Sequence, residues 1–314
     1  MAVILPALVP IYFVLLLGFA AGRTRIVNNA HIRELNTVVM IYALPATLLA
    51  ATAAASREAM LQQWLSFVIF GGAMMLVYPL WYLIERRARR KSVRETAAQS
   101  LTVALPNVAG AGLPIVTTLL GADHIVPVAV AIAAGSLLPL AITLALFESS
   151  QAGSGTRVES PAAQFARGMG HALLKPVVLA PAVGISISLA GWHLPSIVTL
   201  SLKQIGQVGG GLALFVTGLI LSAQRLRLNW NVMLATVVVT IIQPLIALAI
   251  ALTLRASPAN LKISVLMAAL PSGVFGILFG ANYGIASEDS GAIVIASTVV
   301  GAGTLAVIIG WLYV

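Results

Sequence analysis

Residues 104–114 read Ala-Leu-Pro-Asn-Val-Ala-Gly-Ala-Gly-Leu-Pro, and residues 269–276 echo them as Ala-Leu-Pro-Ser-Gly-Val-Phe-Gly. Each stretch lies in the middle of an apolar run of membrane-spanning length. Proline removes a hydrogen bond from the helical ladder and glycine has a high backbone entropy, so a continuous helix is disfavoured at both places. In hydrocarbon, freed backbone groups survive only where protein or a wet cavity surrounds them. The two stretches therefore predict a binding site near the bilayer midplane.

The composition is that of a polytopic membrane protein. Of the 314 residues, 60% are hydrophobic and only 9% are charged, whereas about a quarter would be charged in a soluble domain. The net charge of +9 comes from basic residues in short loops between apolar runs, where they act as topology signals and lipid contacts. We therefore expect the lipid bilayer, and no nucleic acid, as a partner.

Several classes of chemistry are absent from the sequence. The chain has no cysteine, so it has no thiolate metal site and no cysteine nucleophile. It also lacks the zinc-protease, serine-hydrolase and nucleotide-binding motifs. We therefore expect neither an enzyme nor a bound cofactor or metal.

The apolar runs predict the number of membrane-spanning helices. A helix needs about 20 apolar residues to cross the hydrocarbon core. Ten such runs occur, approximately Val3–Gly22, Leu35–Ala54, Leu61–Ile84, Ala97–Leu120, Val126–Phe147, His171–Ala190, Ile197–Ala223, Val232–Leu254, Leu261–Tyr283 and Gly291–Tyr313. A linker, residues 148–170, separates five runs in residues 1–147 from five in residues 171–314. Because five is odd, the halves enter the membrane in opposite orientations. We predict an all-α membrane protein with ten transmembrane helices in two inverted five-helix repeats, with crossed, broken helices 4 and 9.

Basic residues predict the orientation. With the N-terminus outside, the cytoplasmic loops contain all of the 18 Lys and Arg residues except Arg57, Lys203, Arg255 and Lys262, as the positive-inside rule requires. We therefore expect an integral, multi-pass protein of a bacterial inner membrane with both termini non-cytoplasmic and residues 148–170 as a cytoplasmic linker. No basic segment precedes the first apolar run, which favours an uncleaved span over a signal peptide.

Neutral polar residues at mid-depth are the candidate substrate contacts. Two broken helices would present half-helix N-termini, with unpaired N–H groups and partial positive charge, to a carboxylate. Most membrane Ser and Thr residues serve only as interhelical contacts, but Asn107 and Ser272 adjoin the prolines of the two breaks, and Gln243 precedes Pro244. The predicted substrate-binding residues are Pro106, Asn107, Gly110, Gln243, Pro271, Ser272, Gly273 and Asn282.

The acidic residues restrict the mechanism. All nine Asp and Glu residues fall at the ends of predicted spans or in loops, whereas proton relays place ionisable groups within the membrane. A carboxylate relay is therefore disfavoured. H⁺ and Na⁺ both remain as coupling ions, because backbone carbonyls can hold Na⁺ and the substrate can carry a proton.

A series of short motifs resembles the auxin efflux carrier family in its bacterial branch. They are Leu5-Pro6 with Gly18, Leu35-Asn36 with Ala43-Leu44-Pro45-Ala46, Leu105-Pro106-Asn107 with Gly110, Gly112-Leu113-Pro114 and Gly121, and Leu270-Pro271-Ser272-Gly273 through Ala281-Asn282-Tyr283-Gly284. The resemblance covers essentially the whole chain. It implies a scaffold domain from helices 1, 2, 6 and 7, a transport domain from helices 3–5 and 8–10, and a homodimer. It also implies that Asn107 meets the substrate carboxylate.

Together these features predict a secondary transporter that moves small organic carboxylates by alternating access. A dicarboxylate such as malonate is the first candidate, because residues 272–276 look like the malonate-type branch of the family. The close alternative is a monocarboxylic or aromatic acid such as indole-3-acetate. An anion channel or a substrate sensor on a transporter scaffold is the alternative of another class. Direction of transport, oligomeric state and conformational state are left open.

Overall fold

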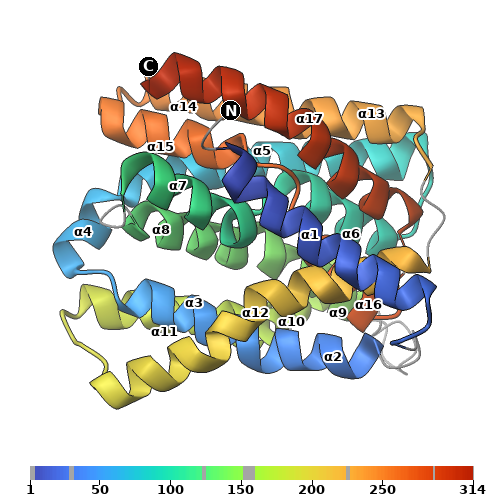
Figure 1. Cartoon of the computed structure of the whole chain (residues 1–314), viewed down its shortest axis with the longest axis horizontal. Coiled ribbons are helices and arrows are strands. Elements are labelled where there is room, and N and C mark those ends of the chain that lie inside the picture. Colours follow the sequence, from blue (N-terminus) through green and yellow to red (C-terminus); the bar gives the residue numbers. More distant parts are fainter. Residues whose placement is uncertain are drawn as a thin grey trace.

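The computed structural model describes residues 4–27, 32–121, 125–150, 160–223, 227–285 and 287–313, and these residues form an all-helical bundle (Figure 1). The first half contains α1 (Ile4–Arg23), α2 (Ile32–Val38), η2 (Val39–Ala43), α3 (Leu44–Ala53), α4 (Arg57–Gln62), α5 (Trp64–Ala88), α6 (Val93–Ala104), η3 (Val108–Gly112), α7 (Leu113–Leu120), α8 (Ile125–Gly135), η5 (Ser136–Leu140) and α9 (Ala141–Ser149). The second half contains α10 (Pro161–Leu173), α11 (Pro176–Leu189), α12 (Ser196–Ser222), α13 (Trp230–Val237), η7 (Val238–Ile242), α14 (Gln243–Thr253), α15 (Pro258–Ala268), α16 (Phe275–Asn282) and α17 (Glu288–Tyr313).

Six helices in the described part of the chain are long and apolar enough to cross a membrane, or seven if one bent pair counts as a span. The six correspond to the predicted spans 2, 3, 5, 7, 8 and 10. Spans 4 and 9 are interrupted, span 1 contributes only the shorter apolar stretch Tyr12–Arg23, and span 6 belongs to the pair α10–α11, which bends by 64°. The chain is thus a multi-pass, all-helical membrane protein, whereas the count of ten spans stays a prediction.

In the described part of the chain, π-helical turns lie in four of the apolar spans, and each turn is associated with a proline. η2, η3 and η7 directly precede the segments that begin Leu44-Pro45, Leu113-Pro114 and Gln243-Pro244, and η5 contains Pro139. Proline lacks an N–H group, and its ring collides with the carbonyl four residues earlier. An extra residue in the turn relieves this conflict, so that the helix continues past the proline.

One group of helices, which comprises α1, α3, α11 and α12, is joined through small residues. A β-carbon at Gly18 would meet the carbonyl oxygen of Phe215, and one at Gly218 would meet that of Leu15. α1 and α12 therefore touch backbone to backbone. Gly184 of α11 packs against α3 in the same manner. Close approach of this kind is what holds helices together in lipid, where the hydrophobic effect does not act between them.

The other group of helices carries the interrupted segments. α5 packs against α6, α8, α14 and α15, α13 packs against α17, and α16 packs against α6. In Figure 1, α3, α11 and α12 lie in the lower part of the bundle, while α13, α14, α15 and α17 lie in the upper part. The two groups contact each other where α3 meets α8, where α12 meets α16 and where α1 meets α17.

Candidate functional site

Two helices are interrupted at the prolines that the sequence marks. α6 ends at Ala104 and η3 begins at Val108, while α15 ends at Ala268 and α16 begins at Phe275. Leu105, which precedes a proline, is extended with φ −101° and ψ 105°, as expected because the proline ring disfavours the helical conformation of the residue before it.

The two interruptions are hydrogen-bonded to each other. The N–H of Asn107 donates to the carbonyl oxygen of Pro271 at 2.8 Å, and the N–H of Gly273 donates to that of Leu105 at 2.8 Å. The segments thus form a short antiparallel bridge. This pairing satisfies backbone groups that would otherwise be unpaired within the bundle. We call the two segments the paired break, defined as residues 105–107 and 271–273.

A small pocket adjoins the paired break. Residues 107–109 line it on one side and residues 273–275 on the other, with Ile132 and Gly135 of α8 completing the wall. The first turns of η3 and α16 therefore face one volume. The first N–H groups of a helix have no intrahelical acceptor and carry partial positive charge, which makes such a volume favourable for an anion. That volume is about 20 Å³, which holds about one water molecule and no dicarboxylate.

Asn107 lies in the wall of this pocket with its side chain partly exposed. Its carbonyl oxygen accepts hydrogen bonds from the N–H groups of Ala111 (2.8 Å) and Gly112 (3.3 Å), and its own N–H is used in the paired break. The backbone is therefore fixed, while the side-chain amide supplies both a donor and an acceptor at the pocket wall. Gly110 lies within η3, directly after the pocket-lining Ala109.

The opposite side of the paired break is buried. Ser272 is 1% exposed, and its N–H donates to the hydroxyl oxygen of Ser297 in α17 at 3.2 Å. The Ser297 hydroxyl donates in turn to the carbonyl oxygen of Val294. Sequence reasoning missed Ser297, because nothing distinguishes it from the other serine and threonine residues of apolar helices.

Gln243 supports the paired break from outside the pocket. It is fully buried, and its Nε2 donates to the carbonyl oxygen of Ala104 at 2.8 Å across 139 residues of sequence. Ala104 is the last residue of α6, where carbonyl groups lack intrahelical donors. The sequence predicted a substrate contact at Gln243, and the structure shows a contact that holds the end of α6.

We expect Gln243→Leu to destabilise the protein by about 1–3 kcal/mol, because the buried carbonyl of Ala104 would lose its donor. Thermal unfolding of the purified protein in detergent measures the effect. Gln207→Leu is the matched control, since Gln207 is exposed on α12. An equal change in melting temperature for both variants would contradict the assigned role.

Asn282 is not brought to the paired break. It is exposed at the last position of α16, whereas the pocket adjoins the first turn of that helix. Its neighbour Tyr283 donates a hydrogen bond to Glu148 Oε1 at 2.7 Å, and Lys175 Nζ lies 2.9 Å from the same oxygen. This end of α16 is therefore tied to α9 and to the bend between α10 and α11.

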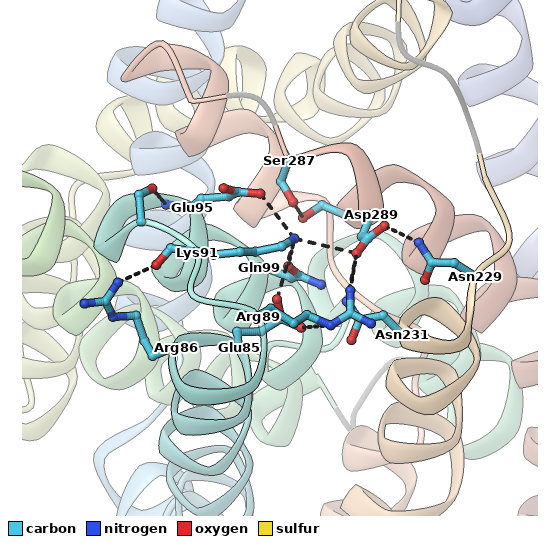
Figure 2. A network of polar contacts seen from close by, with 12 residues as sticks. Glu85, Arg86, Arg89, Lys91, Glu95, Gln99, Asn229, Asn231, Ser287 and Asp289 are labelled. Carbon is cyan, nitrogen blue, oxygen red and sulfur yellow. Dashed lines mark hydrogen bonds and ion pairs between the residues drawn. The ribbon is translucent and has the colours of Figure 1, made fainter.

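The acidic residues at helix ends are more buried than the sequence indicated. Glu85 in the last turn of α5 is fully buried, and Asp289 in the first turn of α17 is 7% exposed. Both contact Arg89 and Lys91 in one polar network (Figure 2). Their positions at span ends agree with the prediction, but their burial arises from helix packing that joins residues 200 positions apart.

A larger cavity of about 440 Å³ lies elsewhere, between η7–α14, α15 and α17. Its lining includes the exposed side chains of Leu245, Val307 and Trp311, and none of its lining residues is charged. Apart from Thr240, Thr304 and Trp311 its lining is apolar, so the groove suits apolar lipid chains better than a carboxylate. The candidate site is therefore the pocket at the paired break.

The comparisons with known proteins show the family of the chain. A family model described as "Membrane transport protein" matches residues 3–309. The chain belongs to this family, that of the auxin efflux carriers. The family resemblance inferred from the motifs is confirmed, and the auxin efflux carrier family is a family of transporters rather than enzymes.

Three relatives show how the similarity is distributed. The "Uncharacterized transporter YfdV" of Escherichia coli (strain K12) is 26% identical over 315 residues, which cover 98% of this chain and 96% of that protein. The "Putative malonate transporter" of Rhizobium meliloti (strain 1021) is 23% identical over 309 residues, covering 97% and 94%. The "Auxin efflux carrier component 8" of Arabidopsis thaliana is 28% identical over 101 residues, covering 31% and 28%.

Proposed function

We propose that this chain is a secondary transporter that moves small organic carboxylates across the membrane by alternating access. The observation that carries the proposal is the pocket at the paired break, where the first turns of two interrupted helices face one volume. A site of this construction at the middle of two spans is typical of secondary transporters.

The chemistry of the pocket favours an anion. Each helix N-terminus is equivalent to roughly half a positive charge, and the N–H groups of Ala109, Val274 and Phe275, which the paired break does not use, are placed to donate to carboxylate oxygens. The Asn107 amide adds a further donor. No charged side chain lines the pocket, so an anion can bind without displacing a salt bridge.

The size of the pocket requires movement. A volume of about 20 Å³ cannot hold a dicarboxylate, so substrate binds only after neighbouring helices rearrange. The two packing groups suit such a change, with α1, α3, α11 and α12 as a scaffold and the group that carries the paired break as the transport domain. In this proposal the paired break is the crossing point of two inverted five-helix repeats, and two copies associate through the scaffold. Both termini lie on the non-cytoplasmic side of a bacterial inner membrane.

A dicarboxylate such as malonate is our first substrate candidate. The relative named for malonate transport matches along 97% of this chain, whereas the auxin carrier matches along 31%. A thermal-shift series with malonate, acetate and indole-3-acetate ranks the candidates, since a ligand that binds the folded state raises its apparent stability. Indole-3-acetate as the best stabiliser would favour the aromatic-acid alternative.

We expect Asn107→Ala to lower carboxylate uptake by about 10- to 100-fold, since a hydrogen bond to a charged group contributes about 1.5–3 kcal/mol. Uptake is measured in proteoliposomes, with saturable counterflow to distinguish a carrier from a channel. Asn282→Ala is the matched control, because Asn282 is exposed at the far end of α16, and it should keep the parent rate. If the two variants transport alike, the site assignment is wrong.

A further inference from the structure

Four helix ends meet in a polar network away from the candidate substrate site. The network joins the end of α5, the start of α6, the start of α13 and the start of α17 (Figure 2). Its charged members come from three of these elements and from the corner between α5 and α6. They are Glu85, Arg89, Lys91, Glu95 and Asp289.

Lys91 occupies the centre of the network. Its Nζ lies 3.0 Å from Gln99 Oε1 and 3.2 Å from Glu95 Oε1. It also lies 3.5 Å from Glu85 Oε2 and 3.6 Å from Asp289 Oδ2, and Figure 2 shows the side chain pointing inward between the carboxylates. The ammonium therefore fills the position that a metal cation would take among these oxygens.

The charged side chains of the network do not balance. Among the described residues, three carboxylates share two cations, and each cation is divided between two or more carboxylates, so the negative charge is not fully compensated. Arg86 contributes no ion pair to this network, because its Nη1 donates to the backbone carbonyl of Lys91 and its side chain is exposed. An uncompensated buried charge is costly, and a carboxylate in that position takes a proton instead.

The hydrogen bonds identify which carboxylate takes the proton. Asp289 accepts from Asn229 Nδ2 (2.7 Å), Asn231 Nδ2 (2.8 Å) and Arg89 Nη1 (3.3 Å), and such bonds stabilise the ionised form. Glu85 is fully buried, its oxygens have no hydrogen-bond partner among the described residues, and its cations lie only at 3.5 and 3.6 Å. Glu95 is partly exposed to water. Of the three carboxylates, Glu85 therefore has the fewest interactions that stabilise its ionised form.

Three helical segments connect this network with the paired break. α6 carries Gln99 in the network and ends at Ala104. The segment α13–α14 carries Asn231 in the network and Gln243, which holds Ala104. α17 carries Asp289 in the network and Ser297, which accepts from the N–H of Ser272. A change of charge in the network therefore acts on elements that fix both sides of the break.

We propose that Glu85 is a proton-binding site that controls transport at the paired break. The Glu85 carboxylate accepts a proton from water at this end of the bundle, which forms a carboxylic acid and neutralises the network, and it returns that proton to the same side. The groups that face Glu85 are Arg89, Lys91, Asp289 and Asn231. The effect on flux rests on the proposed transport function, whereas proton binding itself does not.

The test compares Glu85→Gln with Glu34→Gln, because Glu34 is exposed on α2 and lies outside the network. Counterflow of malonate in proteoliposomes is measured with equal pH on both sides, over a series from acidic to alkaline. The parent and Glu34→Gln should show the same pH dependence, and Glu85→Gln should lose the part that the network contributes and keep the rate that the parent has at the acidic end. Because all three proteins transport the same substrate, its own titration cancels in the comparison. An unchanged pH dependence in Glu85→Gln would overturn the proposal.

Two further measurements keep the proposal testable. The first serves if Glu85→Gln does not fold, and the second serves if the protein does not transport carboxylates. Lys91→Met removes a cation beside Glu85, which favours the protonated acid and should shift the midpoint of the pH dependence to more alkaline values; an unmoved midpoint counts against the site. If the parent shows no carboxylate flux at any pH, the proposed function fails. Thermal unfolding then decides on proton binding, because a proton held only in the folded state makes stability fall as pH rises. Glu85→Gln should reduce that fall, and an identical fall would overturn the site.

Discussion

Replacing Gly273 with alanine is expected to abolish carboxylate transport, with a loss of about 100-fold or more because a displacement of even 1 Å at a binding site has effects of that size. A β-carbon at this position would lie 2.8 Å from the carbonyl oxygen of Leu105 and 3.3 Å from that of Pro106. Both are backbone atoms of the paired break, and the N–H of Gly273 itself donates to Leu105. The methyl group can be accommodated only if this hydrogen bond is lost or lengthened.

Gly301→Ala is the matched control for that experiment. A β-carbon at Gly301 would lie 3.7 Å from Pro271, which is an ordinary contact with the same segment. Uptake in proteoliposomes should be close to the parent rate for Gly301→Ala and absent for Gly273→Ala. Normal uptake by Gly273→Ala would show that the pairing of the two segments is not required for transport.

Gly218→Ala is expected to destabilise the protein by about 3 kcal/mol, at the upper end of the usual cost of overpacking. The added carbon would meet the backbone of α1 at Leu15 and at Phe19, and backbone atoms of a helix cannot rotate away as a side chain can. α1 must then move off α12, which loses the close contact on which helix association in lipid depends.

Thermal unfolding in detergent measures this loss, and Gly211→Ala on the same helix is its control. A β-carbon at Gly211 would have no neighbour within 4 Å, so this substitution should be neutral or slightly stabilising through the lower backbone entropy of alanine. Equal melting temperatures for the two variants would mean that α1 and α12 are not held by backbone contact.

The sequence revealed the features that depend on local chemistry. Pro106 and Pro271 remove N–H groups and disfavour helical backbone, and the helices are interrupted at both. Apolar length identified six of the expected spans as single helices, and the ordered motifs identified the family. These features need only neighbours along the chain.

The features that the sequence did not reveal depend on packing between distant segments. Gln243 adjoins Pro244 in the sequence, yet its role is decided by the end of α6, 139 residues earlier. The sequence placed Glu85 and Asp289 at span ends, but it did not reveal that the convergence of four helix ends buries them. Asn282 belongs to the family motif of the ninth span, but it lies at the end of α16 that is remote from the pocket.

The pairing of residues 105–107 with 271–273 also limits how a gate can work. Separating the two segments would leave two N–H and two carbonyl groups without hydrogen-bond partners in the interior of the bundle. Each such group costs several kcal/mol of free energy. The two spans therefore move as one unit, and in the proposed mechanism the substrate does not enter between them. The substrate would instead reach the pocket when this unit moves relative to α1 and α12, both of which contact η3.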